Sequence, residues 1–292
     1  MPAFTPRQLI LLALLTLIWG LNWPVMKLGV QNFPPLSFRV ASLGMGLALI
    51  FAAARFMHAP LAIARRYWAQ VAWLTLFNTL TWYGLTVIAI PMLSSGRAAI
   101  LGYTMPVFSA VLGSLFFKEQ LPRRAWLGVA AALLGVLLLL WHEMASMGSR
   151  PLGVVLMLVA AVCWAYGTQK MRRADLPVPV ITLSFWMMLS ATLVLAVLAA
   201  LLEHEQWHAP NATAWAAIIF NAVLALAFAQ VVWFFLARTL PPIASTLSVM
   251  LIPVIGVFSG AWWLGEVLHW QDWTAVALMV VAIATVLWPA RK

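Results

Sequence analysis

Two stretches of this sequence repeat one another with the same internal spacing. The first reads PVFSAVLGSLFFKEQL over residues 106–121, and the second reads PVIGVFSGAWWLGEVL over residues 253–268. In each, a proline is followed by a glutamate and, a little further on, by a tryptophan, and all three keep a constant offset of 147 positions. The matched residues are Pro106, Glu119 and Trp126 in the first stretch and Pro253, Glu266 and Trp273 in the second. This shared spacing indicates an internal duplication.

Weaker matches extend the duplication over the rest of the chain. Phe77-Asn78 recurs as Phe220-Asn221 at an offset of 143 positions. Nearer the N-terminus, three matches share an offset of 145 positions: Trp19 with Trp164, Lys27 with Arg172, and Pro34 with Pro179. The matches predict two structural units of similar length, residues 1–145 and 146–292.

The composition excludes a soluble protein. Of the 292 residues, 65% are apolar and 8% are charged, whereas soluble chains hold about 45–50% apolar and about 25% charged residues. The mean hydropathy is +0.99. These figures also exclude a disordered chain, a collagen and a disulfide scaffold, and Cys163 is the single cysteine. The basic residues are scattered through short segments between apolar runs, which is typical of a protein in a lipid bilayer rather than of one that binds nucleic acid.

The apolar runs predict ten transmembrane helices. Each run is continuous for about twenty residues, the length at which a helix crosses the hydrocarbon core, and none shows the alternation of a β-barrel strand. The predicted spans are residues 9–30, 36–57, 68–90, 96–116, 126–141, 152–171, 178–202, 213–236, 244–264 and 270–288. The predicted fold is therefore an all-α polytopic membrane protein, with five spans in each half of the chain.

The basic residues predict how the chain is oriented. Ten crossings place both termini on one side, and 13 of the 17 Lys and Arg residues fall in segments on that side. Cytoplasmic segments carry an excess of these residues, so both termini are predicted to be cytoplasmic. Because five spans is an odd number, the second repeat must insert upside down, with Glu119 on the cytoplasmic side and Glu266 on the outer side. Inverted repeats are common in secondary transporters, whose halves rock around a central site.

Polar and aromatic side chains inside the spans are the candidates for a solute-binding site, because polar groups at bilayer depth are costly. Trp19, Asn22 and Trp23 share one face of the first span, where Pro24 frees a backbone carbonyl. The paired amides at 78 and 221 suit the ammonium or carboxylate of a zwitterion. The full set is Trp19, Asn22, Trp23, Asn78, Trp82, Tyr83, Tyr103, Trp164, Asn221 and Ser248. The alternative for the amides is hydrogen bonding between helices, and for the rings it is packing.

Charged side chains are predicted to lie at the ends of spans. Lys27, Arg39 and Arg97 belong to the outer half of the first repeat, where long cationic side chains snorkel to the interface. The alternative is that one of them attracts a substrate carboxylate. None of the seven acidic residues or five histidines lies in the middle of a span. Since a proton-coupled antiporter needs a titratable group in the membrane, the sequence favours a facilitator.

Other classes of membrane protein lack support in the sequence. It has no nucleotide-binding glycine loop, no histidine pair spaced for a metal and no Ser/His/Asp set at one depth, so neither an enzyme nor a metal or cofactor site is expected. The charged rings and carbonyl filters of ion channels are also missing. An uncharged aromatic site favours amino acids with apolar side chains. Cationic drugs, exported by proton coupling, are the alternative because aromatic rings also bind cations.

Two motifs carry a family resemblance that covers essentially the whole chain. IWGLNWP at residues 18–24 and LPPIASTLSVMLIP at residues 240–253, followed by Gly265-Glu266, resemble the EamA-type repeats of the drug/metabolite transporter superfamily. Within that superfamily, the chain resembles the YddG-type aromatic amino acid exporters of the bacterial inner membrane. That resemblance implies ten helices, cytoplasmic termini and a central cavity lined mainly by helices 1, 3, 4, 6, 8 and 9. It also implies the export of aromatic and other apolar amino acids.

Overall fold

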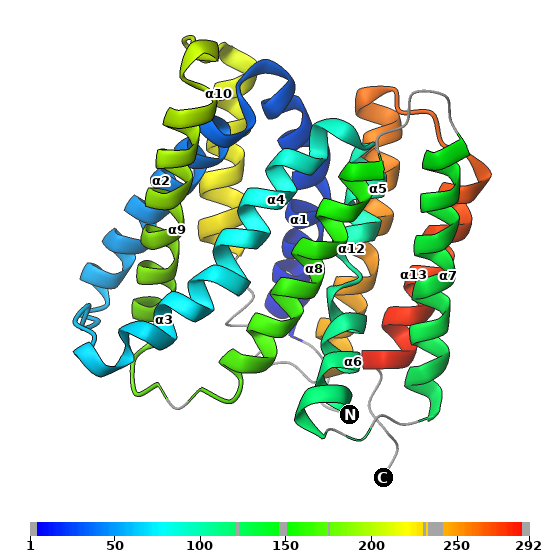
Figure 1. Cartoon of the computed structure of the whole chain (residues 1–292), viewed down its shortest axis with the longest axis horizontal. Helices are drawn as coiled ribbons and strands as arrows, with labels where there is room; N and C mark the ends of the chain where they lie inside the picture. Colours follow the sequence, from blue (N-terminus) through cyan, green and yellow to red (C-terminus); the bar gives the residue numbers. More distant parts are fainter. Residues whose placement is uncertain are drawn as a thin grey trace.

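The computed structural model describes residues 5–118, 120, 123–145, 151–174, 176–229, 232 and 242–287. Over these residues the chain forms helices and contains no strand (Figure 1). Seven helical stretches are long and apolar enough to cross a membrane, and three shorter apolar helices follow them in the second half of the chain. These ten stretches coincide with the ten predicted spans, so the all-helical prediction is confirmed.

Five of the spans are single helices in the first three-quarters of the chain. They are α1 (Pro6–Asn32), α2 (Pro35–Phe56), α7 (Arg123–Ala145), α8 (Pro151–Met171) and α9 (Val180–Leu202). The last two spans are α12 (Pro242–Leu264) and α13 (Trp270–Leu287). Prolines begin several of these helices because the first helical position needs no N–H donor. Pro24 and Pro253 lie inside α1 and α12, which continue past them.

The third and eighth spans each contain a π-helical segment. The third consists of α3 (Trp68–Leu74), the π-helix η2 (Thr75–Leu80) and α4 (Thr81–Ala89). The eighth begins with α10 (Ala212–Ile219) and continues into the π-helix η5 (Phe220–Phe228). Asn78 lies in η2 and Asn221 in η5, so both repeated asparagines lie on the wider π-helical turn. Such segments are rare and are frequently found at functional sites.

The fourth span is broken. It consists of α5 (Ser95–Gly102) and α6 (Met105–Phe117), with Tyr103 and Thr104 between them. Pro106 lies in the first turn of α6, where its missing N–H and its ring weaken the helix through the preceding turn, and the break lies at that point. Short 3-10 turns η1 (Arg65–Tyr67), η3 (Ile90–Met92) and η4 (His204–Gln206) adjoin the third and seventh spans.

Helices of one half of the chain pack mainly against helices of the other half. The pairs α1 with α12, α2 with α9, α4 with α8, and α7 with α13 each join the two halves. In Figure 1, α2 and α9 lie at one side of the bundle, α7 and α13 at the other, and α1, α8 and α12 between them. Gly256 and Gly260 of α12 allow a close approach to α5, because a Cβ at these positions would meet Ala99 and Ser95 within 3 Å.

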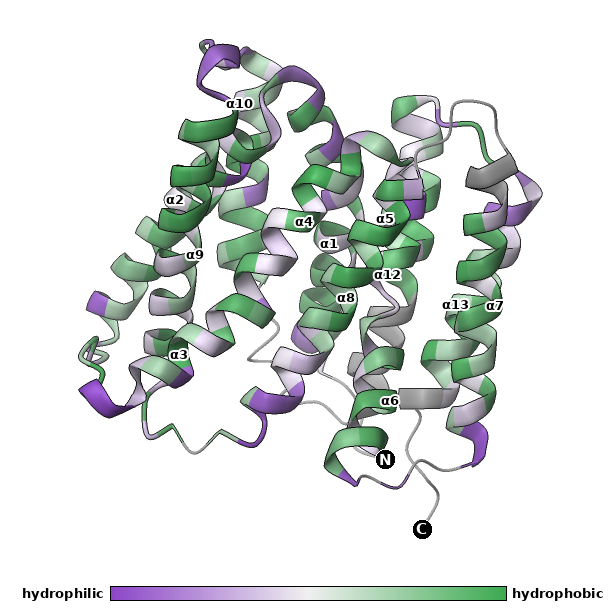
Figure 2. Ribbon diagram, viewed as in Figure 1, coloured by the Kyte–Doolittle hydropathy of each residue, from purple (hydrophilic) through white to green (hydrophobic). Residues whose placement is uncertain are grey.

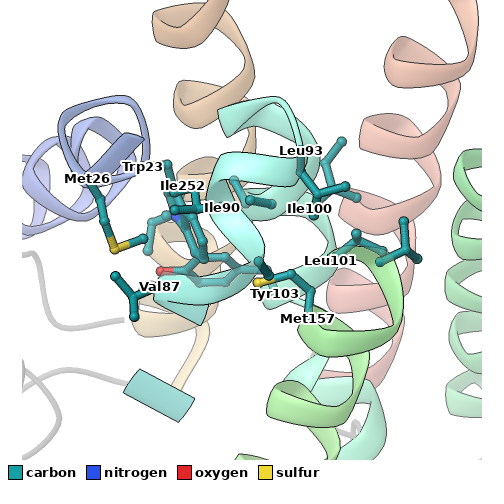
Figure 3. Packing of buried hydrophobic residues seen from close by; sticks show 14 of the residues in the cluster. Trp23, Met26, Val87, Ile90, Leu93, Ile100, Leu101, Tyr103, Met157 and Ile252 are labelled. Carbon is teal, nitrogen blue, oxygen red and sulfur yellow. The ribbon is translucent and has the colours of Figure 1, made fainter. Parts of the chain in front are cut away.

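The outer surface of the bundle is apolar along the helices, as Figure 2 shows. Large side chains such as Leu127, Leu201 and Trp262 are exposed there, as suits contact with lipid. The main buried cluster lies at the centre, where Trp23, Tyr103 and Met157 come from α1, the break in the fourth span and α8 (Figure 3).

Candidate functional site

A chain of hydrogen bonds joins three helices in the middle of the bundle. The Nδ2 of Asn221 donates to Oδ1 of Asn22 at 2.7 Å, which links η5 to α1. The Nη1 of Arg39 then donates to Oδ1 of Asn221 at 3.1 Å, which brings in α2. Asn22 lies more than two turns from either end of α1, and Asn221 is 1% exposed. Two predicted site residues from different halves of the chain therefore meet directly.

Arg39 is the residue of this cluster that the sequence analysis placed wrongly. It was expected to snorkel to the interface, but its side chain is 2% exposed. Its guanidinium carbon lies 5.2 Å from the centroid of the Tyr83 ring, within the range of a cation–π interaction. Its Nη2 lies against Sδ of Met26, and its Nε has no hydrogen-bond partner. Because α2 is apolar on all sides, its sequence does not predict whether a charged side chain faces the interior of the bundle or the lipid.

A second polar contact ties the other repeated asparagine to α8. The Nδ2 of Asn78 donates to Oγ1 of Thr168 at 3.0 Å and to the carbonyl of Trp164 at 3.3 Å. The approach is close, because a Cβ on Gly167 would lie 2.9 Å from Cβ of Asn78. The rings of Trp164 and Trp82 lie 6.4 Å apart. Asn78 therefore connects the third and sixth spans as Asn221 connects the eighth and first, and three predicted site residues meet here.

The remaining aromatic candidates are packed. Trp19 donates from Nε1 to the carbonyl of Ala225 in η5 at 3.2 Å. Trp23 meets Tyr103 edge-to-face with ring centroids 6.4 Å apart, and both are at most 6% exposed. Gly102 leaves room for the Trp23 ring, as a Cβ there would lie 2.8 Å from it. The predicted face of α1 thus divides, since Trp19 and Asn22 meet η5 while Trp23 meets the fourth span.

One predicted site residue has no described side chain. Ser248 lies in the helical part of α12, but its side chain is outside the described residues. The same holds for the side chain of Glu119, which the sequence predicts on the cytoplasmic side.

The other two cations predicted to snorkel are paired with carboxylates. The Nζ of Lys27 lies 3.3 Å from Oε1 of Glu266, and the Nε of Arg97 lies 2.6 Å from Oδ1 of Asp272. Glu266 also accepts hydrogen bonds from the backbone N–H and the hydroxyl of Ser95, at 2.7 and 2.8 Å, and so caps the first turn of α5. Glu266 therefore contacts the N-terminal end of a neighbouring helix. Both ion pairs join the first half of the chain to the second.

Polar and basic groups gather where α8 ends. Gln169 donates from Nε2 to the carbonyl of Ser109 in α6 at 2.6 Å and accepts a hydrogen bond from Arg173. Arg173 lies 4.1 Å from the centroid of the Phe117 ring, and a surface groove opens there between α3, α6 and α8. Among the described residues no group of three His, Cys, Asp or Glu side chains is placed to hold a metal ion.

The bundle has apolar outer faces, two amides that bridge helices of different halves and a buried cation at its centre. These features define a polytopic protein of the membrane-transporter class. A model of the EamA-like transporter family matches the chain twice, over residues 7–141 and 151–288. The chain belongs to this family and is a multi-pass membrane transporter.

Named relatives cover most of the chain at low identity. An "Uncharacterized inner membrane transporter YedA" of Escherichia coli K12 is 27% identical over 95% of this chain and 91% of its own length. The "Uncharacterized transporter YoaV" of Bacillus subtilis is 26% identical over 84% of each chain. A "Probable amino-acid metabolite efflux pump" of Salmonella typhimurium is 26% identical over 92% of this chain and 91% of its own length. One crystal structure superposes with a TM-score of 0.67 at 18% identity, covering 94% and 96% of the two chains, which supports the fold alone.

Proposed function

We propose that the protein exports small amphiphilic amino acids and related metabolites, aromatic ones among them, across the bacterial inner membrane. The observation that carries the proposal is the pair of asparagines at equivalent positions of the two halves. Asn78 and Asn221 each lie on a π-helical turn and each bridge to a helix of the other half. Amides offer both donors and an acceptor to a zwitterion, and the rings of Trp82, Trp164 and Tyr83 lie beside them.

The relatives support this class of substrate only in general terms. One of them is named as a probable amino-acid metabolite efflux pump and another as an inner membrane transporter. The preference for aromatic side chains rests on the resemblance to the YddG-type exporters and on the tryptophan-rich interior. A solute with an apolar side chain would stack on these rings while its charged groups meet the amides.

The proposed mechanism is alternating access by two inverted five-helix units, residues 1–145 and 146–292, with both termini in the cytoplasm. The contacts between spans support this proposal, because equivalent spans of the two units have equivalent neighbours. The third and sixth spans pack as the eighth and first do, and α8 packs on the fourth span as α1 packs on α12. A pair of equivalent units can adopt two mirrored arrangements around one central site, each of which opens it to one side.

Transport is proposed to be facilitative, because no acidic residue or histidine of the sequence lies in the middle of a span. Uptake of labelled tryptophan into proteoliposomes, with and without an imposed pH gradient, tests this. We expect saturable uptake that other apolar amino acids compete for and that the gradient leaves unchanged. Gradient-driven movement of a quaternary ammonium without tryptophan uptake would contradict the proposal and favour a proton-coupled exporter of cationic drugs.

A further inference from the structure

We infer that Arg39 is the anchor for a carboxylate group of the transported solute and that it selects carboxylates over solutes that carry only an amine. The inference rests on the proposed function, because it names the substrate group that the central site binds. Arg39 lies a little over one turn into α2, and its side chain reaches into the cluster formed with Asn221 and Tyr83.

The first step is the cost of burying this charge. An arginine side chain stays protonated in proteins, and an isolated charge in an apolar interior is costly unless it is paired. No carboxylate of the described residues lies within salt-bridge distance of Arg39. Its contacts are one neutral amide oxygen, one thioether sulfur and one aromatic face, which together offset only part of that cost.

Arg97 shows how the same chain treats a buried arginine with a structural role. Its Nε and Nη2 donate to the two carboxylate oxygens of Asp272 at 2.6 and 3.3 Å, the forked geometry that suits a guanidinium and a carboxylate. Arg39 is buried more deeply, at 2% exposure against 9% for Arg97, yet it has no such partner. The Nε of Arg39 is buried without any hydrogen bond, so one donor of its fork stays open.

The residues around the open donor allow a ligand to enter. Nη2 is covered by Sδ of Met26, and a methionine side chain is flexible and a thioether is a weak acceptor. A carboxylate that displaced Met26 would accept two parallel hydrogen bonds from Nε and Nη2. Tyr83 lies against the guanidinium group, and Asn22 bonds Asn221, the partner of Nη1. Both are only partly buried, and Asn22 would contact the ammonium group and Tyr83 the side chain of an amino acid. A cationic solute would instead be repelled by Arg39.

The test compares tryptophan with tryptamine, which has the same ring and amine but lacks the carboxylate. Uptake of both is measured in proteoliposomes that contain the wild type, Arg39→Gln, Arg39→Lys or Arg55→Gln. Arg55 is a matched control because it lies exposed in the last turn of the same helix. We expect Arg39→Gln to lower tryptophan uptake by about 10- to 100-fold, the loss of a charge-assisted pair, without lowering tryptamine uptake. We expect Arg39→Lys to give a smaller loss and Arg55→Gln none.

Equal loss of both solutes in the Arg39 variants, or an unchanged ratio between them, would overturn the inference while leaving the proposed function in place. A second measurement, of ligand binding, tests the inference if the Arg39→Gln variant fails to fold or if the wild type does not transport tryptophan. In it, the thermal unfolding of the purified wild type and Arg39→Lys is followed with indole-3-propionate or tryptamine. Stabilisation of the wild type by indole-3-propionate, lost in Arg39→Lys, supports the anchor even if tryptophan is not transported. No stabilisation of the wild type by the carboxylate would overturn the anchor.

Discussion

At the scale of single residues, the hydrogen bond between Asn22 and Asn221 carries both structure and the proposed site. Replacing Asn22 with leucine removes the acceptor of a buried amide, and leaving such a donor unsatisfied costs about 1–3 kcal/mol. We therefore expect Asn22→Leu to lower the free energy of unfolding by that amount and to abolish tryptophan uptake. Both are measured on the purified protein, by thermal unfolding and in proteoliposomes.

The control for Asn22→Leu is Thr274→Val, since Thr274 is exposed on α13 and bonds the carbonyl of Trp270 in its own helix. It is expected to change neither quantity. Near-normal tryptophan uptake by a folded Asn22→Leu protein would remove this residue from the site.

The residue scale also marks the limit of what the sequence predicts. The repeat placed Asn78 and Asn221 in equivalent positions, and the structure gives both the same kind of neighbour. The prediction for Arg39 was wrong because an arginine near the end of a span can either snorkel to the interface or be buried against other helices. Which of the two occurs depends on the residues that its side of the helix contacts. Those neighbours, Asn221 and Tyr83, are 182 and 44 positions away in the sequence, so only tertiary structure brings them together.

At the scale of helices, span positions were predictable and their internal geometry was not. The bilayer sets the length of an apolar run, so the predicted bounds of α2 and α9 agree with the structure to about two residues. The π-helical segments η2 and η5 pack against helices of both halves of the chain, and an apolar pattern does not predict them. The break before α6 has a local signal in the sequence, which is Pro106 in the first turn of that helix.

The cap on α5 gives the first prediction at this scale. Glu266 forms an ion pair with Lys27 and accepts a hydrogen bond from the first turn of α5. The side chains of Lys27 and Glu266 are 14% and 10% exposed. Glu266→Gln keeps the shape but loses the charge, and we expect the free energy of unfolding to fall by about 2–3 kcal/mol. The pH dependence of transport should stay unchanged, since Glu266 lies at a helix end.

Thermal unfolding of Glu266→Gln is compared with that of Glu205→Gln, whose side chain is 88% exposed and whose loss should leave the midpoint unaltered. Equal midpoints for the two variants would show that the cap contributes nothing. A lost pH response would overturn the facilitative mechanism.

The contact between α8 and η2 gives a second prediction. A Cβ at Gly167 would lie 2.9 to 3.2 Å from Cβ, N and Cα of Asn78, so Gly167→Ala must push the two spans apart. Overpacking of this kind costs about 1–3 kcal/mol, and thermal unfolding should show it. Gly44→Ala is the matched control, because that position of α2 is open and alanine favours a helix. Equal or opposite shifts for the two variants would mean that this contact relaxes without cost.

At the scale of the whole molecule, the proposed pair of inverted five-span units is consistent with the two matches of the family model to the chain. An odd number of spans per unit has one consequence that labelling can measure, which is that equivalent positions face opposite sides of the membrane. Gln120 and Val267 are such a pair, separated by the offset of 147 positions, and both are exposed.

With the single native cysteine removed as Cys163→Ala, we expect a membrane-impermeant maleimide to label Val267→Cys in intact spheroplasts. Gln120→Cys should react only after the membrane is permeabilised, because the excess of Lys and Arg places its side of the protein in the cytoplasm. The reverse pattern would keep the inverted repeat but turn the whole protein over. Labelling of both positions from the same side would mean that the two units insert in parallel, and rocking of mirrored halves would no longer explain transport.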